Sequence, residues 1–359
     1  MFRSKLVSAL ALFCLSGATA SYAADTTMPA GFPVIEPDTP KSATVTEPAQ
    51  AALPPNVLLL PKSAAPASAD QLIDGLGAVR FSRDGKQMDI GVPARLRNML
   101  RAPRQEGVIP TGGKGKLVQI NNTTQFPFTT IGVLATGCSG TIVAKRFVLT
   151  AAFCLFDRKA QKPYENLDFY PALNGKEQPY GVVKWKSVWL PKGFLKDGNS
   201  QYDFGLVELA SDIGDQTGWF GFGHVEKFDF KELTLTGYPW EGVPDWTLWQ
   251  TACQIDAAEP NFLFYRCPGQ SAALETMTGS AIWYKGAADD AWQILAIHNY
   301  AQNDKKDSWW ALRLNQANTE TIIAWIDAAN KGGGGQTSDG EGTGTEQVTD
   351  KQDCTCDQQ

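Results

Sequence analysis

The chain has 359 residues, of which 43% are hydrophobic and 19% charged, an ordinary composition for a globular protein that can bury a core. This length corresponds to about two domains. The formal net charge of -6 implies no basic surface, so we expect no nucleic-acid partner.

Residues 1–23 have the features of a secretory signal peptide. Arg3 and Lys5 form a basic n-region, Leu6–Leu15 forms an apolar h-region, and residues 21–23 place small side chains at the cleavage positions. The apolar run is too short to cross a bilayer, which argues against a membrane anchor, and no later stretch is long enough. The sequence therefore predicts a secreted or periplasmic protein without a membrane span.

Residues 24–70 are rich in Ala, Pro, Thr and Ser and show no periodicity, which predicts a disordered or extended linker. Residues 71–107 contain more apolar positions and a cluster of arginines that a protease could cut. We interpret them as a pro-segment or a docking segment. The alternative is a solvated linker with a short helix at 94–101.

Residues 108–330 are expected to form the folded domain. Short apolar or alternating runs recur between Gly, Pro, Asn and Asp, which indicates an all-β sandwich or barrel. Examples of these runs are Thr130–Leu134, Thr141–Val143, Phe147–Thr150, Val182–Trp185, Phe204–Leu209, Leu233–Thr236, Ser280–Tyr284 and Trp292–Ile297.

The end of this domain follows a different pattern. Apolar residues recur at helical spacing from Ile322 to Ala329, Asn318 can cap the helix, and Gly332 supplies a stop. The sequence thus predicts an all-β body closed by one C-terminal helix. Residues 331–359 contain a glycine run followed by Asp, Glu, Thr and Gln, which is typical of a flexible acidic tail.

Six cysteines follow the predicted signal peptide, an even number that favours disulfides over metal ligation in an exported chain. Their spacing suggests the pairs Cys138–Cys154 and Cys253–Cys267. With only two histidines, we expect no metal site, and we also expect no cofactor.

The remaining two cysteines, Cys354 and Cys356, lie in the tail. A bridge between residues two apart would be strained. The pair is therefore a candidate for reaction or for cross-linking to a partner, and the alternative is an idle tail.

Residues 137–154 read GCSGTIVAKRFVLTAAFC. A Cys, a small-residue turn, an apolar strand and T-A-A-x-C resemble the histidine segment of trypsin-like serine proteases. Other segments resemble the same family in the same order, and most closely its bacterial glutamyl endopeptidases. These are 108–109 with 126–128, 202–209, 235–239, 277–283, 296–298 and 312–315.

The resemblance covers about 220 of the 359 residues. It implies two six-stranded antiparallel β-barrels with the site in the cleft between them. It also assigns catalytic positions to individual residues. The base position holds Phe153, the orienting acid is Asp203, the nucleophile position holds Thr278, and an oxyanion-hole glycine is replaced by Thr276.

These residues do not make a working triad. Phe153 cannot accept a proton, and a mid-chain threonine hydroxyl such as that of Thr278 needs a neighbouring base. The β-branched Thr276 resists the backbone angles that glycine permits. None of the catalytic positions other than Asp203 is therefore intact.

The resemblance also implies a substrate pocket formed by His298, Ala272 and Ala301, in which His298 would help to bind an acidic side chain. The alternative is a structural histidine on a half-buried strand. The other histidine, His224, is expected on the surface or in a loop. Three tryptophans after Pro239 are candidates for an exposed recognition patch, namely Trp240, Trp246 and Trp249.

Together these features predict an exported, inactive protease homologue that binds a protein or peptide in the former substrate cleft. The alternative is an active serine-type endopeptidase with a displaced base, acid-specific through His298. A third interpretation treats residues 71–107 as an inhibitor-like pro-segment of a dormant domain.

Overall fold

The computed structural model describes residues 68–100, 116–225, 233–267, 271–285, 292–301 and 308–331. The chain divides into two compact units, Met1–Thr46 and Glu47–Gln359, and all described residues belong to the second. The predicted signal peptide, nearly all of the predicted linker, Gly332 and the cysteines of the tail lie outside the described residues.

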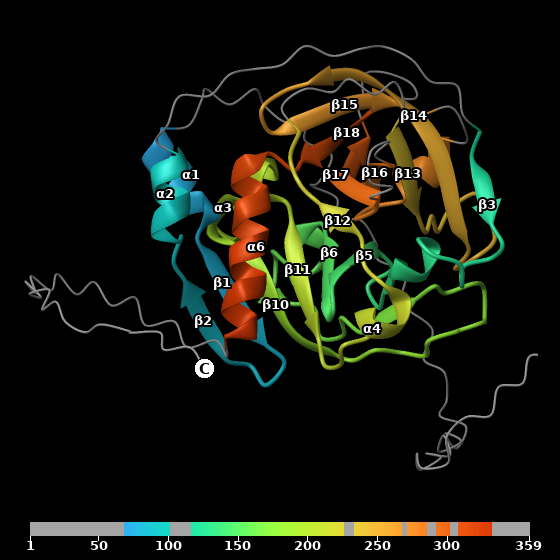
Figure 1. Cartoon of the computed structure of the whole chain (residues 1–359), viewed down its shortest axis with the longest axis horizontal. Helices are drawn as coiled ribbons and strands as arrows, with labels where there is room; N and C mark the ends of the chain where they lie inside the picture. The colour runs from blue at the N-terminus through green and yellow to red at the C-terminus, as the bar shows by residue number, and fades with distance from the viewer. Residues whose placement is uncertain are drawn as a thin grey trace, which may run out of the picture. The chain divides into compact units, whose positions relative to one another are not determined.

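The second of two barrels is a closed, six-stranded antiparallel ring (Figure 1). Each strand pairs with the next in the order β16-β13-β14-β15-β18-β17, and β17 returns to β16. Two short strands, β3 (Val118–Ile120) and β12 (Gly221–Phe222), pair with its margins. The ring strands are β13 (Leu233–Gly237), β14 (Leu248–Ala258), β15 (Phe262–Arg266), β16 (Ala281–Lys285), β17 (Trp292–Ala301) and β18 (Ser308–Arg313).

The first barrel uses six strands in the order β10-β11-β6-β5-β4-β9. A bridge between Phe169 and Val183 brings β9 back to the residues just before β10. The two-barrel prediction is thereby confirmed. The strands are β4 (Ile131–Leu134), β5 (Ser139–Ala144), β6 (Phe147–Thr150), β9 (Phe169–Pro171), β10 (Trp185–Pro191) and β11 (Gly205–Leu209), and a separate small sheet joins β7 (Phe156–Asp157) to β8 (Lys162–Pro163).

Two further strands extend the first sheet to eight, and both precede the predicted domain. β1 (Ala78–Ser82) pairs with β10, and β2 (Gln87–Ile90) pairs with β1. They lie between the helices α1 (Ala69–Leu76) and α2 (Ala94–Leu100). The short helix expected at 94–101 is confirmed, but the described part of this segment is not a solvated linker, because β1 belongs to the barrel sheet.

The predicted C-terminal helix is α6 (Gln316–Asn330), which lies along the first barrel beside β11 in Figure 1. Its N-cap is Asn315 and not Asn318, since the Asn315 side chain accepts the Asn318 N–H at 2.9 Å. Trp325 on this helix stacks on Phe204 with 5.3 Å between the ring centroids. The remaining helices are short: α3 (Lys192–Asp197), α4 (Gly214–Thr217), α5 (Ser271–Glu275), η1 (Phe128–Thr130), η2 (Ala152–Cys154) and η3 (Ser200–Tyr202).

Both disulfides expected from the cysteine spacing are present, Cys138–Cys154 in the first barrel and Cys253–Cys267 in the second. All four cysteines are buried. No helix within the described part of the chain is long and apolar enough to span a bilayer.

Candidate active-site region

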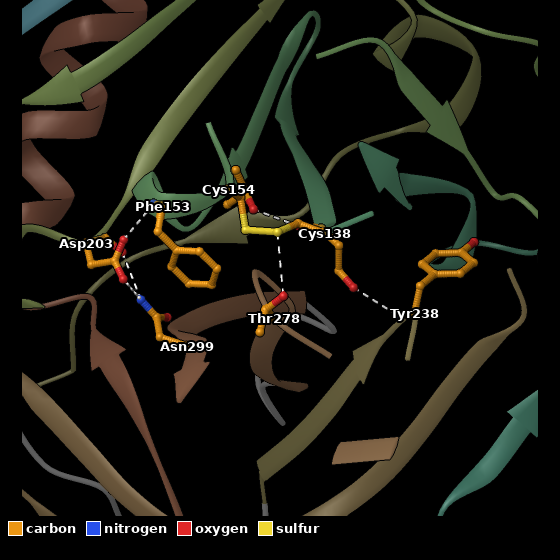
Figure 2. The surroundings of a disulfide bond; sticks show 9 residues. Cys138, Phe153, Cys154, Asp203, Tyr238, Thr278 and Asn299 are labelled. Atoms are coloured by element: carbon orange, nitrogen blue, oxygen red, sulfur yellow. Dashed lines mark hydrogen bonds between the residues drawn. A yellow bond between two sulfur atoms is a disulfide. The ribbon is translucent and has the colours of Figure 1, made fainter. Parts of the chain in front are cut away.

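Four segments from the two barrels meet around the first disulfide (Figure 2). Phe153 lies in η2 directly after β6, and Asp203 lies between η3 and β11. Thr278 follows α5, and Asn299 lies on β17. The residues expected at the base, acid and nucleophile positions are thus brought together by the fold.

Phe153, the residue expected at the base position, is a buried apolar side chain with 5% of its surface exposed. Its ring points toward Thr278 and Asn299 in Figure 2. The backbone N–H of Phe153 donates to Asp203 Oδ1 at 3.0 Å. The main chain therefore keeps a hydrogen bond to the acid, while the side chain offers no proton acceptor.

Asp203 is fully buried, and both carboxylate oxygens accept hydrogen bonds. The Asn299 amide donates to Asp203 Oδ2 at 3.0 Å and to the Asp203 carbonyl at 3.0 Å. The role of Asn299 was not predicted from the sequence, although this residue directly follows His298 in the resembling strand. The sequence did contain a signal for this role. Asn299 is a polar residue in an apolar strand, and a buried amide needs a hydrogen-bond partner.

Thr278 is 3% exposed and its hydroxyl lies 3.5 Å from Cys138 Sγ. The disulfide sulfur carries no hydrogen, so the hydroxyl donates. The Thr278 carbonyl accepts the Ser139 N–H at 2.9 Å, which joins this turn to the first barrel. The hydroxyl is thus directed at a weak acceptor and not at a group that could remove its proton.

The following Gly279 has φ +78°, in the left-handed region that glycine adopts without strain. A Cβ there would lie 2.3 Å from Thr150 Oγ1 and 2.4 Å from the Ser139 carbonyl. Glycine at this position therefore permits the close packing of the second barrel's turn on the first barrel.

The Thr276 N–H, which would help to form an oxyanion hole, donates to the Ala273 carbonyl at 3.2 Å. The Thr276 hydroxyl donates to the same carbonyl at 3.0 Å and accepts the Trp240 N–H at 3.1 Å. Since this N–H already has an acceptor within the chain, it is not directed at a substrate oxygen in this arrangement.

His298 is fully buried and both ring nitrogens have partners in the chain. Nε2 lies 2.8 Å from the Leu274 carbonyl, which can only accept, so Nε2 carries the proton. Nδ1 then accepts from the Tyr265 hydroxyl. Burial lowers the pKa of His298 to about 4, against the opposing effect of the Leu274 hydrogen bond, and the ring is neutral at pH 7.

The other two residues of the predicted pocket are Ala272 and Ala301. Ala272 is an exposed residue of α5, and the side chain of Ala301 lies outside the described atoms. An acid-binding pocket at His298 therefore stays a prediction, and in this structure neither nitrogen is left for a ligand. His224 lies in a loop after β12 and is partly exposed, as expected.

The three tryptophans of the predicted recognition patch are each partly exposed. The Trp240 backbone N–H donates a hydrogen bond to the Thr276 hydroxyl, and the Trp246 carbonyl accepts the Gly175 N–H of the first barrel at 3.0 Å. Trp249 Nε1 donates to the Thr247 hydroxyl at 2.8 Å. The loop is therefore anchored to both barrels, and its role in recognition stays a prediction.

No protein-family model matches the chain. Over 196 residues the chain is 29% identical to the glutamyl endopeptidase of Bacillus licheniformis, a match that covers 53% of this chain and 60% of that protein. It is 23% identical over 292 residues to inactive serine protease 35 of Mus musculus, covering 63% of this chain and 70% of that protein.

Among solved structures, a Glu endopeptidase in complex with MPD superimposes with a TM-score of 0.51 at 20% identity, covering 60% of this chain and 99% of that one. The chain spans about 60% of the length of the glutamyl endopeptidase that it matches in sequence. The described domain therefore has the chymotrypsin-like fold of the trypsin-like serine proteases, and glutamyl endopeptidases are among its homologues.

Proposed function

We propose that this protein is an exported, catalytically inactive homologue of trypsin-like serine proteases that binds a protein or peptide. The observation that carries the proposal is the pairing around Asp203. A serine protease needs an imidazole between the acid and the nucleophile. Here the Phe153 side chain stands at that position, and the Asn299 amide donates to the acid.

No other histidine supplies the missing base. The chain contains two histidines, His224 and His298. His298 donates to a carbonyl and accepts from a hydroxyl deep in the second barrel, and His224 lies in the loop after β12. A displaced base would therefore require rearrangement of a buried hydrogen-bond network.

The nucleophile and oxyanion positions support the same conclusion. Thr278 donates toward a disulfide sulfur, and the Thr276 N–H is bound within the chain. Loss of triad members costs about 10⁴–10⁶ in rate, and loss of one oxyanion donor costs about 10²–10³. These losses overlap and do not simply add, but together they leave little reason to expect peptide hydrolysis.

Export is supported by the two disulfides, which form and persist in oxidising compartments. The predicted signal peptide agrees with a secreted or periplasmic location. Binding is supported by the fold, whose active homologues are endopeptidases and must hold a polypeptide. The name of the mouse homologue shows that inactive proteins occur among the relatives.

The second candidate function is a working serine-type endopeptidase, and the retained, fully buried Asp203 favours it. The purified protein would be tested with fluorogenic peptides that contain Glu or Arg. We expect no turnover above that of the Thr278→Ala variant. Turnover that Thr278→Ala or Asp203→Ala abolishes would contradict the inactive assignment.

Binding in the former cleft needs a separate test. Peptides selected on the full chain would be titrated against two tryptophan variants. Trp240→Ala removes a partly exposed ring beside the Thr276 turn, and Trp219→Ala removes a ring that is 45% exposed next to β12. We expect Trp240→Ala to weaken binding at least about tenfold and Trp219→Ala to have little effect. Equal effects would contradict a cleft site.

A further inference from the structure

The segment before the protease-like domain is built into the first barrel. All five residues of β1 pair with β10, from Ala78 opposite Pro191 to Ser82 opposite Ser187. The pairing continues on both sides, since the Arg83 N–H donates to the Lys186 carbonyl at 2.9 Å and the Lys192 N–H donates to the Gly77 carbonyl at 2.6 Å. The edge of β10 is therefore covered along its length, as Figure 1 shows.

The same segment contributes to the hydrophobic core of the barrel. The Phe81 ring lies 5.7 Å from the Phe156 ring, centroid to centroid. Release of the segment would return this apolar surface to water, which opposes dissociation. The buried apolar residues of the segment that share the core cluster are Ile73, Leu76, Ala78, Phe81, Val92 and Leu96.

A buried ion pair fixes the segment to β11. Arg80 donates to Glu208 Oε2 at 2.8 Å, with the two side chains 13% and 0% exposed. Ser187 and Lys186 also donate to Glu208, at 2.7 Å and 2.8 Å. Burial raises the pKa of Glu208, but these hydrogen bonds and the Arg80 charge together hold it below its usual value. Without Arg80, the buried carboxylate would lose a partner.

Helix α1 of the segment also reaches the loop that holds the acid position. The Tyr202 ring, adjacent to Asp203, lies between Gly75 of α1 and Gly193 of α3. A Cβ at Gly75 would lie 2.2 Å from the ring, and one at Gly193 would lie 2.3 Å away. The two helices thus pack so tightly against the Tyr202 ring that only glycine fits at these two positions.

We propose that residues 68–97 are a permanent part of the domain and not a removable pro-segment. If a protease cuts the chain between residues 101 and 115, the segment stays bound and the product is a two-chain protein. This proposal is independent of whether the active-site region binds peptides or hydrolyses them.

The test places a recognition site for a specific protease between Leu100 and Lys116 in the full chain, cleaves it, and applies the product to native gel filtration with mass spectrometry. We expect the two pieces to co-elute. Separation of the pieces under native conditions, whatever the state of the larger one, would overturn the proposal.

A matched pair of variants tests the reason for retention. Arg80→Met removes the buried ion pair, and Lys86→Met removes an exposed one in the same hairpin, whose side chains are 82% and 53% exposed. In the cleaved protein we expect Arg80→Met to lower the melting temperature by about 5 °C or more, and Lys86→Met to leave it nearly unchanged. Equal effects would show that Arg80 does not anchor the segment.

Discussion

Two buried carboxylates lie near each other in the chain, one within β11 and one just before it, and different kinds of hydrogen-bond donor stabilise them. Glu208, within β11, accepts from Arg80, Lys186 and Ser187, which link it to the N-terminal segment and to β10. Asp203, just before β11, accepts from a backbone N–H and from the Asn299 amide. One site is organised around cations that stabilise the fold. The other holds the residue expected as the triad acid by hydrogen bonds from a backbone N–H and a side-chain amide.

The largest effect on stability is expected when the carboxylate of Glu208 is removed from its cationic partners. Glu208→Gln leaves Arg80 buried without its charge partner, and we expect a loss of about 3–5 kcal/mol in the free energy of unfolding. Urea denaturation measures it. The control is Asp215→Asn, which removes the exposed partner of Lys145 and should cost less than about 1 kcal/mol.

The second prediction concerns pH and uses the two histidines as a pair. The pKa of folded His298 is about 4, below its unfolded value, so the unfolded chain binds the proton first as the pH falls. Between pH 7 and 4.5 we therefore expect a loss of about 2–3 kcal/mol in stability. His298→Gln should remove this loss and His224→Gln should keep it. The lowered pKa of Glu208 acts below this window, because its contribution is lost only at more acidic pH.

The third prediction perturbs the amide-held acid. Asp203→Asn replaces one acceptor by an NH₂ group that faces the Phe153 N–H or the Asn299 amide. We expect a loss of about 1–2 kcal/mol, since a buried donor is left without an acceptor. Chemical denaturation measures it. A loss as large as that of Glu208→Gln would mean that the two carboxylates contribute alike to stability.

The smallest expected effect is on activity. Phe153→His places an imidazole beside Asp203, yet we expect no measurable peptide hydrolysis. Thr278 would still donate toward the disulfide, and the Thr276 N–H would still be bound to Ala273. Turnover should require Thr276→Gly and Thr278→Ser in the same protein, measured with fluorogenic peptides. Activity of the single variant would show that the lost base alone separates this site from an enzyme.

The sequence predicted the features that local patterns encode. Alternating runs identified seven of the barrel strands, but the run Val182–Trp185 meets β10 only at Trp185, and β9, β14, β15 and β18 were not among the runs. Cysteine spacing identified both disulfides. The family motifs placed Phe153, Asp203 and Thr278 near one another. The prediction of the C-terminal helix was correct, but the prediction of its N-cap was wrong. Asn315 and Asn318 both precede the apolar positions, and periodicity alone does not distinguish between them.

Other features depend on contacts between distant segments. The role of β1 was not predicted because its pairing with β10 joins residues more than 100 positions apart, and a short apolar run is consistent with a linker or a strand. The role of the Asn299 amide depends on the Asp203 carboxylate, which lies about 100 positions away in the chain and reaches the amide only in the folded protein. The involvement of the Thr276 N–H with Ala273 is likewise a property of the folded turn.

Ser139 forms hydrogen bonds that join the two barrels, and they offer a way to detect separation of the barrels. Its N–H donates to the Thr278 carbonyl, its hydroxyl accepts the Tyr238 N–H at 2.8 Å, and its carbonyl accepts the Thr150 hydroxyl at 2.7 Å. The first two bonds cross from one barrel to the other. The Ser139 amide hydrogen should therefore exchange with solvent only when the barrels separate, which makes a single amide a reporter of interdomain opening.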